Sequence, residues 1–504
     1  MARPSRHPHF NRYHWLWYLR RVPDVVFAGR LPRSVAYDRA LAEAMAFASS
    51  PTGGAQHADD RDVSFPVTQR EVAAIAWLIG YCTLVADLHS SYRRCGKGAA
   101  LILDASQLIG PGQRPTECDP ETAAAIDLYD RRLETSGTEA FFGADVVREA
   151  PASFAESPGE QLRLFARVPN DELTDVHVGT GKAWSFRYVP RSLIIDDLEA
   201  LLADHRVEAT PVWAQEITDT LSIIALGGVV TDVNLEPESA LVNLQTVTRT
   251  GYVVIHGDVL RGTWAEPYRN EVTRLQHRFP SWSRHLDTDV SALLERVMAM
   301  PSAVWPLKGK ALAFSATPGC IGIDFAGASS RFLSGLRYPA GDGAVAKARA
   351  DMFERRVQAR IDASTWCPPS ELAAFRGKHL RCQGSRIGEI DALAVNGDDC
   401  VVVSCKSKLY TDGHETGDHK AVREAAQRVT RAMSELDHFV ERLRATPHGD
   451  NYDFRGMRLH GVVVTPHLFY IRLPDVDRFT LPGLRTYSTL AELQQWLDGH
   501  PQAP

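Results

Sequence analysis

The pattern of apolar and polar positions is clearest in the last third of the chain. Apolar side chains recur at every fourth position at Phe353, Val357 and Ile361, which predicts one face of a helix. An Asn396-Gly397 pair between two apolar runs is a strong signal for a β-hairpin. The same patterns predict a strand at 379–381, paired strands at 389–395 and 400–406, a long helix at 420–444, strands at 459–464 and 485–487, and a last helix at 490–497.

Before residue 340 the helix and strand signals mix. A breaker cluster, Pro339-Ala340-Gly341-Asp342-Gly343, predicts a domain boundary. The patterns divide the chain into a basic and aromatic segment at 1–48, a mainly helical domain at 64–205, an α+β middle domain at 206–338 and a last domain at 341–504. Within the earlier regions they predict helices at 73–92 and near 217–226, alternation at 161–189, and strands at 242–247, 252–256 and 311–314. The expected fold class is α/β in the last domain and α+β for the whole chain, with a mixed, largely helical N-terminal region.

Composition narrows the class of protein only slightly. The chain has 504 residues, a net charge of -6 and 23% charged residues, which excludes a histone-like basic protein but not a local basic groove. Its eight cysteines form no C-x-x-C pair, so no zinc site or disulfide framework is indicated. The longest apolar run, 73–86, is shorter than the roughly 18 residues that span a bilayer, and the start lacks a secretory signal. We therefore expect a cytoplasmic protein with no membrane partner.

Polar side chains on the predicted hairpin carry the candidate chemistry. Because strand side chains alternate, Glu389 and Asp391 share a face, and so do Ser404 and Lys406. Carboxylates beside a lysine can hold Mg²⁺ through oxygen ligands and position a water molecule against a phosphodiester. The lysine can orient that water or stabilise the charge that develops on the phosphate. Burying such groups is costly unless they pair or bind metal, so the pattern indicates a metal-dependent hydrolytic site.

Three short segments in this order resemble the PD-(D/E)XK, or restriction-endonuclease-like, nuclease superfamily. They are Phe353-Glu354, Gly388-Glu389-Ile390-Asp391 and Ser404-Cys405-Lys406-Ser407. In many members a helix with Phe-Glu precedes a Gly-Glu-Ile-Asp strand, and an apolar strand then ends in Glu-Cys-Lys-Ser. The resemblance covers only the last domain, 341–504, and implies an αβββαβ core.

The resemblance also implies roles for individual residues. Asp391 is expected to be the central metal ligand, Lys406 the catalytic lysine and Glu354 a further acid from the first helix. The carbonyl of Cys405 is expected to contact the metal, and Glu389 to assist. The implied cofactor is Mg²⁺ or Mn²⁺.

Position 404 departs from the family pattern. The family places Glu, Asp or sometimes Gln there, and a serine hydroxyl is a neutral and poor ligand for Mg²⁺. In one interpretation, Glu424 on the following helix replaces the missing acid. Glu415 and Asp418 are the next candidates for that role. A second makes Ser404 a substitution introduced to silence cutting, and a third makes the domain naturally degenerate, able to bind nucleic acid without cleaving it.

Basic residues after the hairpin are candidates for phosphate contacts. They lie on or just before the predicted long helix and are Lys408, Lys420, Arg423, Arg428 and Arg431. A solvated helix face is the alternative interpretation.

Other motifs are weaker. The segments Cys95-Gly96-Lys97-Gly98 and Gly179-Thr180-Gly181-Lys182 lack the earlier Gly and the following Ser or Thr of a P-loop, so we reject a P-loop. His414 and His419 lack a third ligand in register and are expected to be solvated loop residues.

The patterns on the hairpin, together with the resemblance to this superfamily, predict a metal-dependent endonuclease that hydrolyses phosphodiester bonds of nucleic acid, with DNA the expected polymer. Restriction or antiphage defence is the suggested setting, by analogy alone. The N-terminal region would serve recognition or regulation, and a homodimer or larger oligomer is expected, with a partner subunit left open. The competing class is a catalytically silent nuclease-fold protein that binds nucleic acid or scaffolds a complex, and a third is a sensor of small molecules in the N-terminal region.

Overall fold

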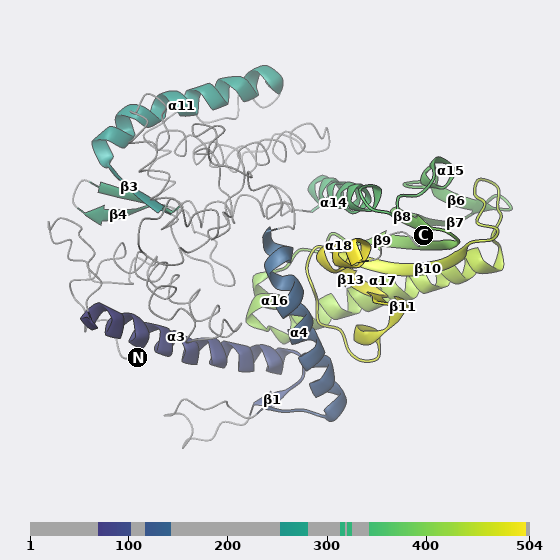
Figure 1. Cartoon of the computed structure of the whole chain (residues 1–504), viewed down its shortest axis with the longest axis horizontal. Helices are drawn as coiled ribbons and strands as arrows, with labels where there is room; N and C mark the ends of the chain where they lie inside the picture. Colours follow the sequence, from purple (N-terminus) through teal and green to yellow (C-terminus); the bar gives the residue numbers. More distant parts are fainter. Residues whose placement is uncertain are drawn as a thin grey trace. The chain divides into compact units, whose positions relative to one another are not determined.

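A computed structural model of the chain describes residues 69–101, 116–142, 252–280, 313–317, 320–324 and 342–499 (Figure 1). The segment 1–48 and the elements predicted at 161–189, 217–226 and 242–247 lie outside the described residues. The chain divides into two compact units, residues 1–87 with 145–336, and residues 88–144 with 337–504. Both units combine helices and strands, so the α+β expectation for the whole chain is confirmed.

The second unit contains more of the chain than the predicted last domain. It resumes at Arg337, close to the predicted boundary, but it also includes residues 88–144. The sequence patterns assign those residues to a separate helical domain at 64–205. Local periodicity indicates that a helix has a buried face, but it does not say which part of the chain covers that face.

The first unit contains an antiparallel sheet in the order β3-β5-β4. Its strands are β3 (Tyr252–His256), β4 (Ala313–Thr317) and β5 (Cys320–Asp324), and α11 (Gly257–Arg278) follows β3 directly. The long helix α3 (Gln69–Gly96) begins in this unit and ends in the second. Among the helices of the described ranges, none has the combination of length and apolar character that crossing a membrane requires.

A four-stranded sheet in the order β13-β10-β9-β8 forms the centre of the second unit. Its strands are β8 (Ala392–Asn396), β9 (Asp399–Cys405), β10 (Arg458–Thr465) and β13 (Tyr487–Thr489). Strands β8 and β9 are antiparallel, and their turn contains Gly397 with a φ of 58°, a conformation that favours glycine. This is the hairpin that the Asn396-Gly397 pair predicts. Strand β10 pairs in parallel with β9 and with β13.

Shorter elements complete the second unit. They are β1 (Ala100–Leu101), β2 (Thr116–Glu117), α15 (Ser370–Ala373), β6 (His379–Cys382), β7 (Ser385–Glu389), α16 (Asp412–Thr416), η3 (Asp475–Asp477), β11 (Phe479–Leu481) and β12 (Leu484–Arg485).

Helices cover both faces of the central sheet (Figure 1). One face, which includes Leu393 and Val402, packs with the buried side of α17 (His419–Ala445). The other face, which includes Ala394 and Val401, packs with α14 (Ala344–Asp362) and α18 (Leu490–Gly499). Strands that are apolar on both faces are expected where helices cover both sides, and this explains the continuous apolar run of β9.

The helix α4 (Pro120–Phe142) is part of the same core. Its side chains Ala125, Ile126 and Tyr129 are buried in the cluster that α17 and β10 share. A region about 200 residues before the predicted boundary therefore completes the hydrophobic core of the second unit.

The prediction of one continuous strand at 389–395 is wrong, because the structure divides this segment between β7 and β8. The interruption falls at Ile390-Asp391. The carbonyl of Ile390 accepts a hydrogen bond from the amide of Gly377 at 2.8 Å, and Ile390 forms an isolated bridge with Arg376. These contacts occupy the backbone of Ile390 between the β7 and β8 ladders, just before Asp391.

The absence of a side chain at Gly388 lets α17 approach β7. A Cβ atom at this position would overlap the ring edge of Phe439, which is buried. We expect Gly388→Ala to lower the free energy of unfolding by about 1–3 kcal/mol, the usual cost of overpacking. Thermal unfolding of the full chain measures the effect, with exposed Ser385→Ala on the same strand as control. If the clash is the cause, Phe439→Leu in the Gly388→Ala background recovers part of the loss; equal stability of Gly388→Ala and the parent would contradict this packing.

Candidate active site

Asp391 lies at the break between β7 and β8, where its carboxylate contacts the end of β9. Its Oδ2 accepts a hydrogen bond from the amide of Cys405 at 2.7 Å and a longer one from the Ser404 hydroxyl at 3.4 Å. The Lys406 Nζ lies 4.0 Å from the same oxygen. Burial raises the pKa of Asp391, and the positive charge of Lys406 and the Cys405 amide oppose that rise. The hairpin therefore brings the aspartate and the lysine of the motif together.

The end of β9 is anchored by neighbouring elements, which positions Lys406. The amide of Lys406 donates to the carbonyl of Val464 on β10 at 2.9 Å. One residue further on, the carbonyl of Ser407 accepts from the Arg349 guanidinium of α14 at 3.2 Å. The Lys406 side chain itself is 45% exposed, so it can reach a substrate while its backbone is fixed.

Glu354 enters the site from α14. The helix is fixed on the sheet by the fully buried side chains of Phe353 and Val357, which flank Glu354 in sequence. One turn later, Gln358 accepts a hydrogen bond from the amide of Leu393 at 3.3 Å and ties α14 to the start of β8. Burial raises the pKa of Glu354 to about 7, and the negative charge of Asp391 adds to this rise.

Glu389 lies at the rim of the site. Its carboxylate is within 2.9 Å of the His379 Nδ1 and accepts a hydrogen bond from Arg386 at 3.2 Å. Its charge contributes to the raised pKa of both Glu354 and Asp391, after the larger contributions of burial. Glu389 is thus near enough to influence the pKa of both Glu354 and Asp391, but its side chain is more exposed than either of theirs.

Glu424, the proposed replacement acid, lies on the exposed surface of α17. Its negative charge acts on Lys408, whose pKa is lowered first by burial and then by the nearby Arg428. The carboxylates whose negative charge raises the pKa of Asp391 or of Glu354 lie instead at the end of β7 and on α14. Of the two acids named behind Glu424, Asp418 caps α17 by accepting from the amide of Ala421 at 2.8 Å, and the side chain of Glu415 lies outside the described part of the chain.

The residues present fit a divalent cation that is held only partly by protein. Within the described ranges, no group of three or more His, Cys, Asp or Glu side chains could hold a metal ion by itself. Mg²⁺ is commonly bound through one or two carboxylates together with water and substrate phosphates. Burial is the main cause of the raised pKa of both Glu354 and Asp391, and the charge of Asp391 adds to the rise at Glu354, so a cation between the two carboxylates would relieve both the cost of burial and their repulsion.

The basic residues predicted to contact phosphate fall into two groups in the structure. Lys408 and Arg428 lie near one another beside the end of β9, and the Lys408 Nζ is 5.7 Å from the centre of the Phe469 ring. Arg423 and Arg431 instead line a pocket on another side of α17. Lys420 is exposed in the first turn of that helix.

The expectation that His414 is solvated is wrong. His414 is only 5% exposed, with its ring against Tyr410 and Phe469. Burial and the nearby positive charge of Lys97 lower its pKa to about 3, so it is neutral at physiological pH. His419 is exposed, as expected.

Sequence reasoning missed the residues that support the site, Gln358 and Arg349. Gln358 could have been found, because it lies four residues after Glu354 and therefore on the same side of the helix. Arg349 acts through a backbone carbonyl 58 residues away, and no local pattern indicates such a contact.

Models of known protein families give no match to this chain, and comparisons with curated proteins and with solved structures give none either.

The raised pKa of Glu354 predicts how stability depends on pH when metal is absent. The pKa is about 7 in the folded chain against an ordinary value of 4.5, so the folded state binds the proton more tightly than the unfolded state does. The contribution to stability is therefore full below the unfolded pKa and is lost as the pH rises through about 7. Its magnitude is on the order of 1–3 kcal/mol, because solvent screens a half-buried group. We expect the melting temperature in EDTA to fall between about pH 5 and pH 8, and Glu354→Gln to reduce that fall.

Thermal unfolding of the full chain across this range tests the prediction, with Glu371→Gln on exposed α15 as a control for loss of a carboxylate. A fall of the same size in Glu354→Gln and in the parent would contradict a buried, proton-binding Glu354.

Proposed function

We propose that the second unit is a metal-dependent nuclease that hydrolyses phosphodiester bonds of nucleic acid, with DNA the expected polymer. The observation that carries the proposal is the convergence of Glu354, Asp391 and Lys406, which come from a helix, a strand break and the end of a strand. The order of the central elements, α14 followed by the β8–β9 hairpin, α17 and β10, supports a restriction-endonuclease-like core.

Asp391 and Glu354 would hold Mg²⁺ or Mn²⁺, with the carbonyl of Cys405 as a further oxygen donor. The bound ion would supply Lewis acidity and lower the pKa of a water molecule that attacks phosphorus. Glu389 would add negative charge at the rim.

Lys406 has the exposure and the position to act on the reacting phosphate. Its ammonium group lies 4.0 Å from Asp391, with a side chain that is nearly half exposed. It would orient the attacking water or stabilise the charge that develops on the phosphate oxygens. Its backbone is hydrogen-bonded to β10, so substitution of the side chain should leave the strand in place.

Lys408 and Arg428 would contact the phosphate backbone of the polymer next to this site. A single site cuts one strand at a time, so cleavage of both strands of a duplex favours a homodimer. The first unit would provide recognition or regulation.

One observation favours a second candidate function, in which the domain binds nucleic acid without cutting it. Ser404 stands where the nuclease pattern has an acid, and it donates its hydroxyl to Asp391 instead of adding a charge. A metal site with one carboxylate fewer binds Mg²⁺ more weakly. The two functions make opposite predictions for cleavage.

The test is incubation of the full chain with labelled single- and double-stranded DNA and RNA in Mg²⁺ or Mn²⁺. Cleavage that EDTA abolishes supports the nuclease. Ser404→Glu restores the expected acid, and Glu424→Ala removes the alternative one. If neither the parent nor Ser404→Glu cleaves nucleic acid, the nuclease function is ruled out. If Glu424→Ala cleaves as well as the parent, Glu424 is excluded as the replacement metal ligand.

A further inference from the structure

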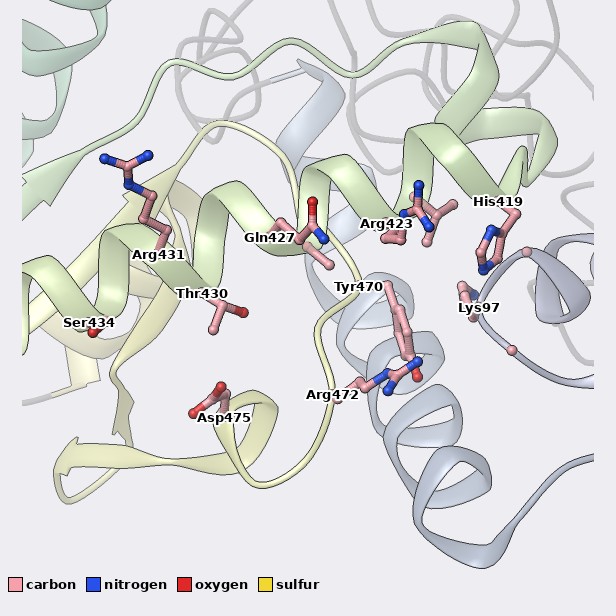
Figure 2. Close-up of a pocket in the computed structure, with 14 residues that line it drawn as sticks. Lys97, His419, Arg423, Gln427, Thr430, Arg431, Ser434, Tyr470, Arg472 and Asp475 are labelled. Carbon is pink, nitrogen blue, oxygen red and sulfur yellow. The ribbon is translucent and has the colours of Figure 1, made fainter.

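A pocket of about 680 Å³ lies on a different side of α17 from Lys408 and Arg428, and the nuclease proposal gives it no role. Its walls come from the segment 96–98 at the end of α3, from α17 and from the segment 470–475 (Figure 2). All three belong to the second unit. The volume is within the range of about 300–1,000 Å³ that is typical of small-molecule sites.

The lining of the pocket is strongly basic. Four Lys or Arg side chains line it, against the single carboxylate of Asp475. Among the described residues, neither Arg423 nor Arg472 forms an ion pair, whereas the Lys97 Nζ lies 3.0 Å from Asp130. Two guanidinium groups without a counter-charge in the described part of the chain form a site that suits an anion with several oxygens.

A buried hydroxyl points independently to a polar ligand. Tyr470 is only 3% exposed and lines the pocket, and its hydroxyl has no hydrogen-bond partner within the ranges that the structure describes. An unsatisfied buried hydroxyl is costly, and a small shift of this side chain toward the pocket would let a bound polar group satisfy it. Figure 2 draws Tyr470 with Lys97, Arg423 and Arg472 toward one end of the pocket.

The other end of the pocket has a different chemical character. Thr430, Ser434, Asp475 and Arg431 lie there, and Gln427 lies between the two ends (Figure 2). The Arg431 guanidinium at this end is already paired with Glu435 at 2.7 Å. Thr430 comes seven positions after Arg423, which corresponds to about 10 Å along the helix axis. A carboxylate and hydroxyls at that end can bind ligand hydroxyl or amino groups, as an acidic residue does with the ribose in dinucleotide sites.

We propose that this pocket binds a phosphorylated small molecule of nucleotide size, with its phosphates at the Arg423 and Arg472 end and its hydroxyl-bearing part near Asp475. Lys97 comes from the Cys95-Gly96-Lys97-Gly98 segment, which the sequence rejects as a P-loop. The backbone of Gly96 lies so close to Gly417 that a Cβ atom would overlap it, so glycine is required there for a packing reason. The segment therefore supplies one lysine to the pocket and no phosphate-binding loop.

Binding of the four ribonucleoside triphosphates and of inorganic phosphate to the full chain in EDTA tests the proposal by calorimetry. We expect saturable binding of at least one triphosphate, weakened at least about tenfold by Arg423→Ser and by Arg472→Ser. Tyr470→Phe keeps the buried ring and should weaken binding severalfold. Arg442→Ser, at the exposed far end of the same helix, should bind like the parent, and so should Asp391→Asn, which separates this pocket from the nuclease site.

The proposal would be overturned if none of the four triphosphates bound saturably at concentrations up to about 5 mM. It would equally be overturned if the Arg423 and Arg472 variants bound as tightly as the parent. Binding of a single-stranded oligonucleotide through these arginines without binding of any triphosphate would also overturn it, because the pocket would then belong to the path of the polymer.

Discussion

Lys406→Met is expected to reduce nucleic-acid cleavage by about 10²–10⁴-fold while leaving binding of the polymer largely unchanged. The methionine keeps the length of the side chain but removes the charge that lies 4.0 Å from Asp391. Loss of a group that orients the water or stabilises the phosphate in the transition state costs this much in other enzymes. Asp391→Asn should reduce cleavage at least as far and also weaken the dependence on metal concentration, because it removes a metal ligand.

Single-turnover cleavage and filter binding on the same preparations measure the two effects separately. Lys378→Met, an exposed lysine before β6, is the matched control and should cut like the parent. If Lys406→Met retained more than about a tenth of the parent rate, Lys406 would not be the catalytic lysine.

Arg132→Met is expected to lower the free energy of unfolding of the second unit by about 3–5 kcal/mol. The Arg132 side chain is 4% exposed and forms two hydrogen bonds of 2.8 Å with the Glu492 carboxylate. It also donates to the carbonyls of Val476 and Tyr487 at 3.2 and 2.9 Å. Removing it leaves a partly buried carboxylate without its counter-charge and two buried carbonyls with fewer donors.

The double variant Arg132→Met/Glu492→Gln distinguishes loss of the charge pair from loss of packing. Glutamine keeps an oxygen that can accept from the amide of Thr489, which Glu492 caps at 2.8 Å. If the unpaired charge causes the damage, the double variant is more stable than Arg132→Met in thermal and urea unfolding. A loss below about 1 kcal/mol for Arg132→Met would mean that α4 is not fixed to the second unit through this contact.

The sequence predicted local features well where a short-range rule governs them. The Asn396-Gly397 pair and the alternation around it predict the β8–β9 hairpin. The four-residue spacing of Phe353, Val357 and Ile361 predicts α14 with those three side chains buried. Both rules depend on residues close in the chain, namely turn geometry and the periodicity of one helix face.

Long-range contacts could not be predicted in the same way. The strand break before Asp391 coincides with the hydrogen bond from the Gly377 amide to Ile390, and the packing of α4 includes the contact between Arg132 and Glu492, which are 360 residues apart. Apolar periodicity indicates that Ile126 and Tyr129 face a hydrophobic core, but it does not show which part of the chain forms that core. The cluster of Glu354 with Asp391 was expected from the resemblance alone, since no local pattern indicates that α14 crosses β8 at that point.

A crystal structure of the chain with Mn²⁺ and a short DNA strand, read by anomalous scattering from the metal, tests the proposed nuclease site directly. We expect a peak bound by the carboxylates of Asp391 and Glu354 and next to a phosphate that Lys406 contacts. A peak elsewhere, or no peak between these two carboxylates at saturating Mn²⁺, would contradict a nuclease site built from Glu354, Asp391 and Lys406.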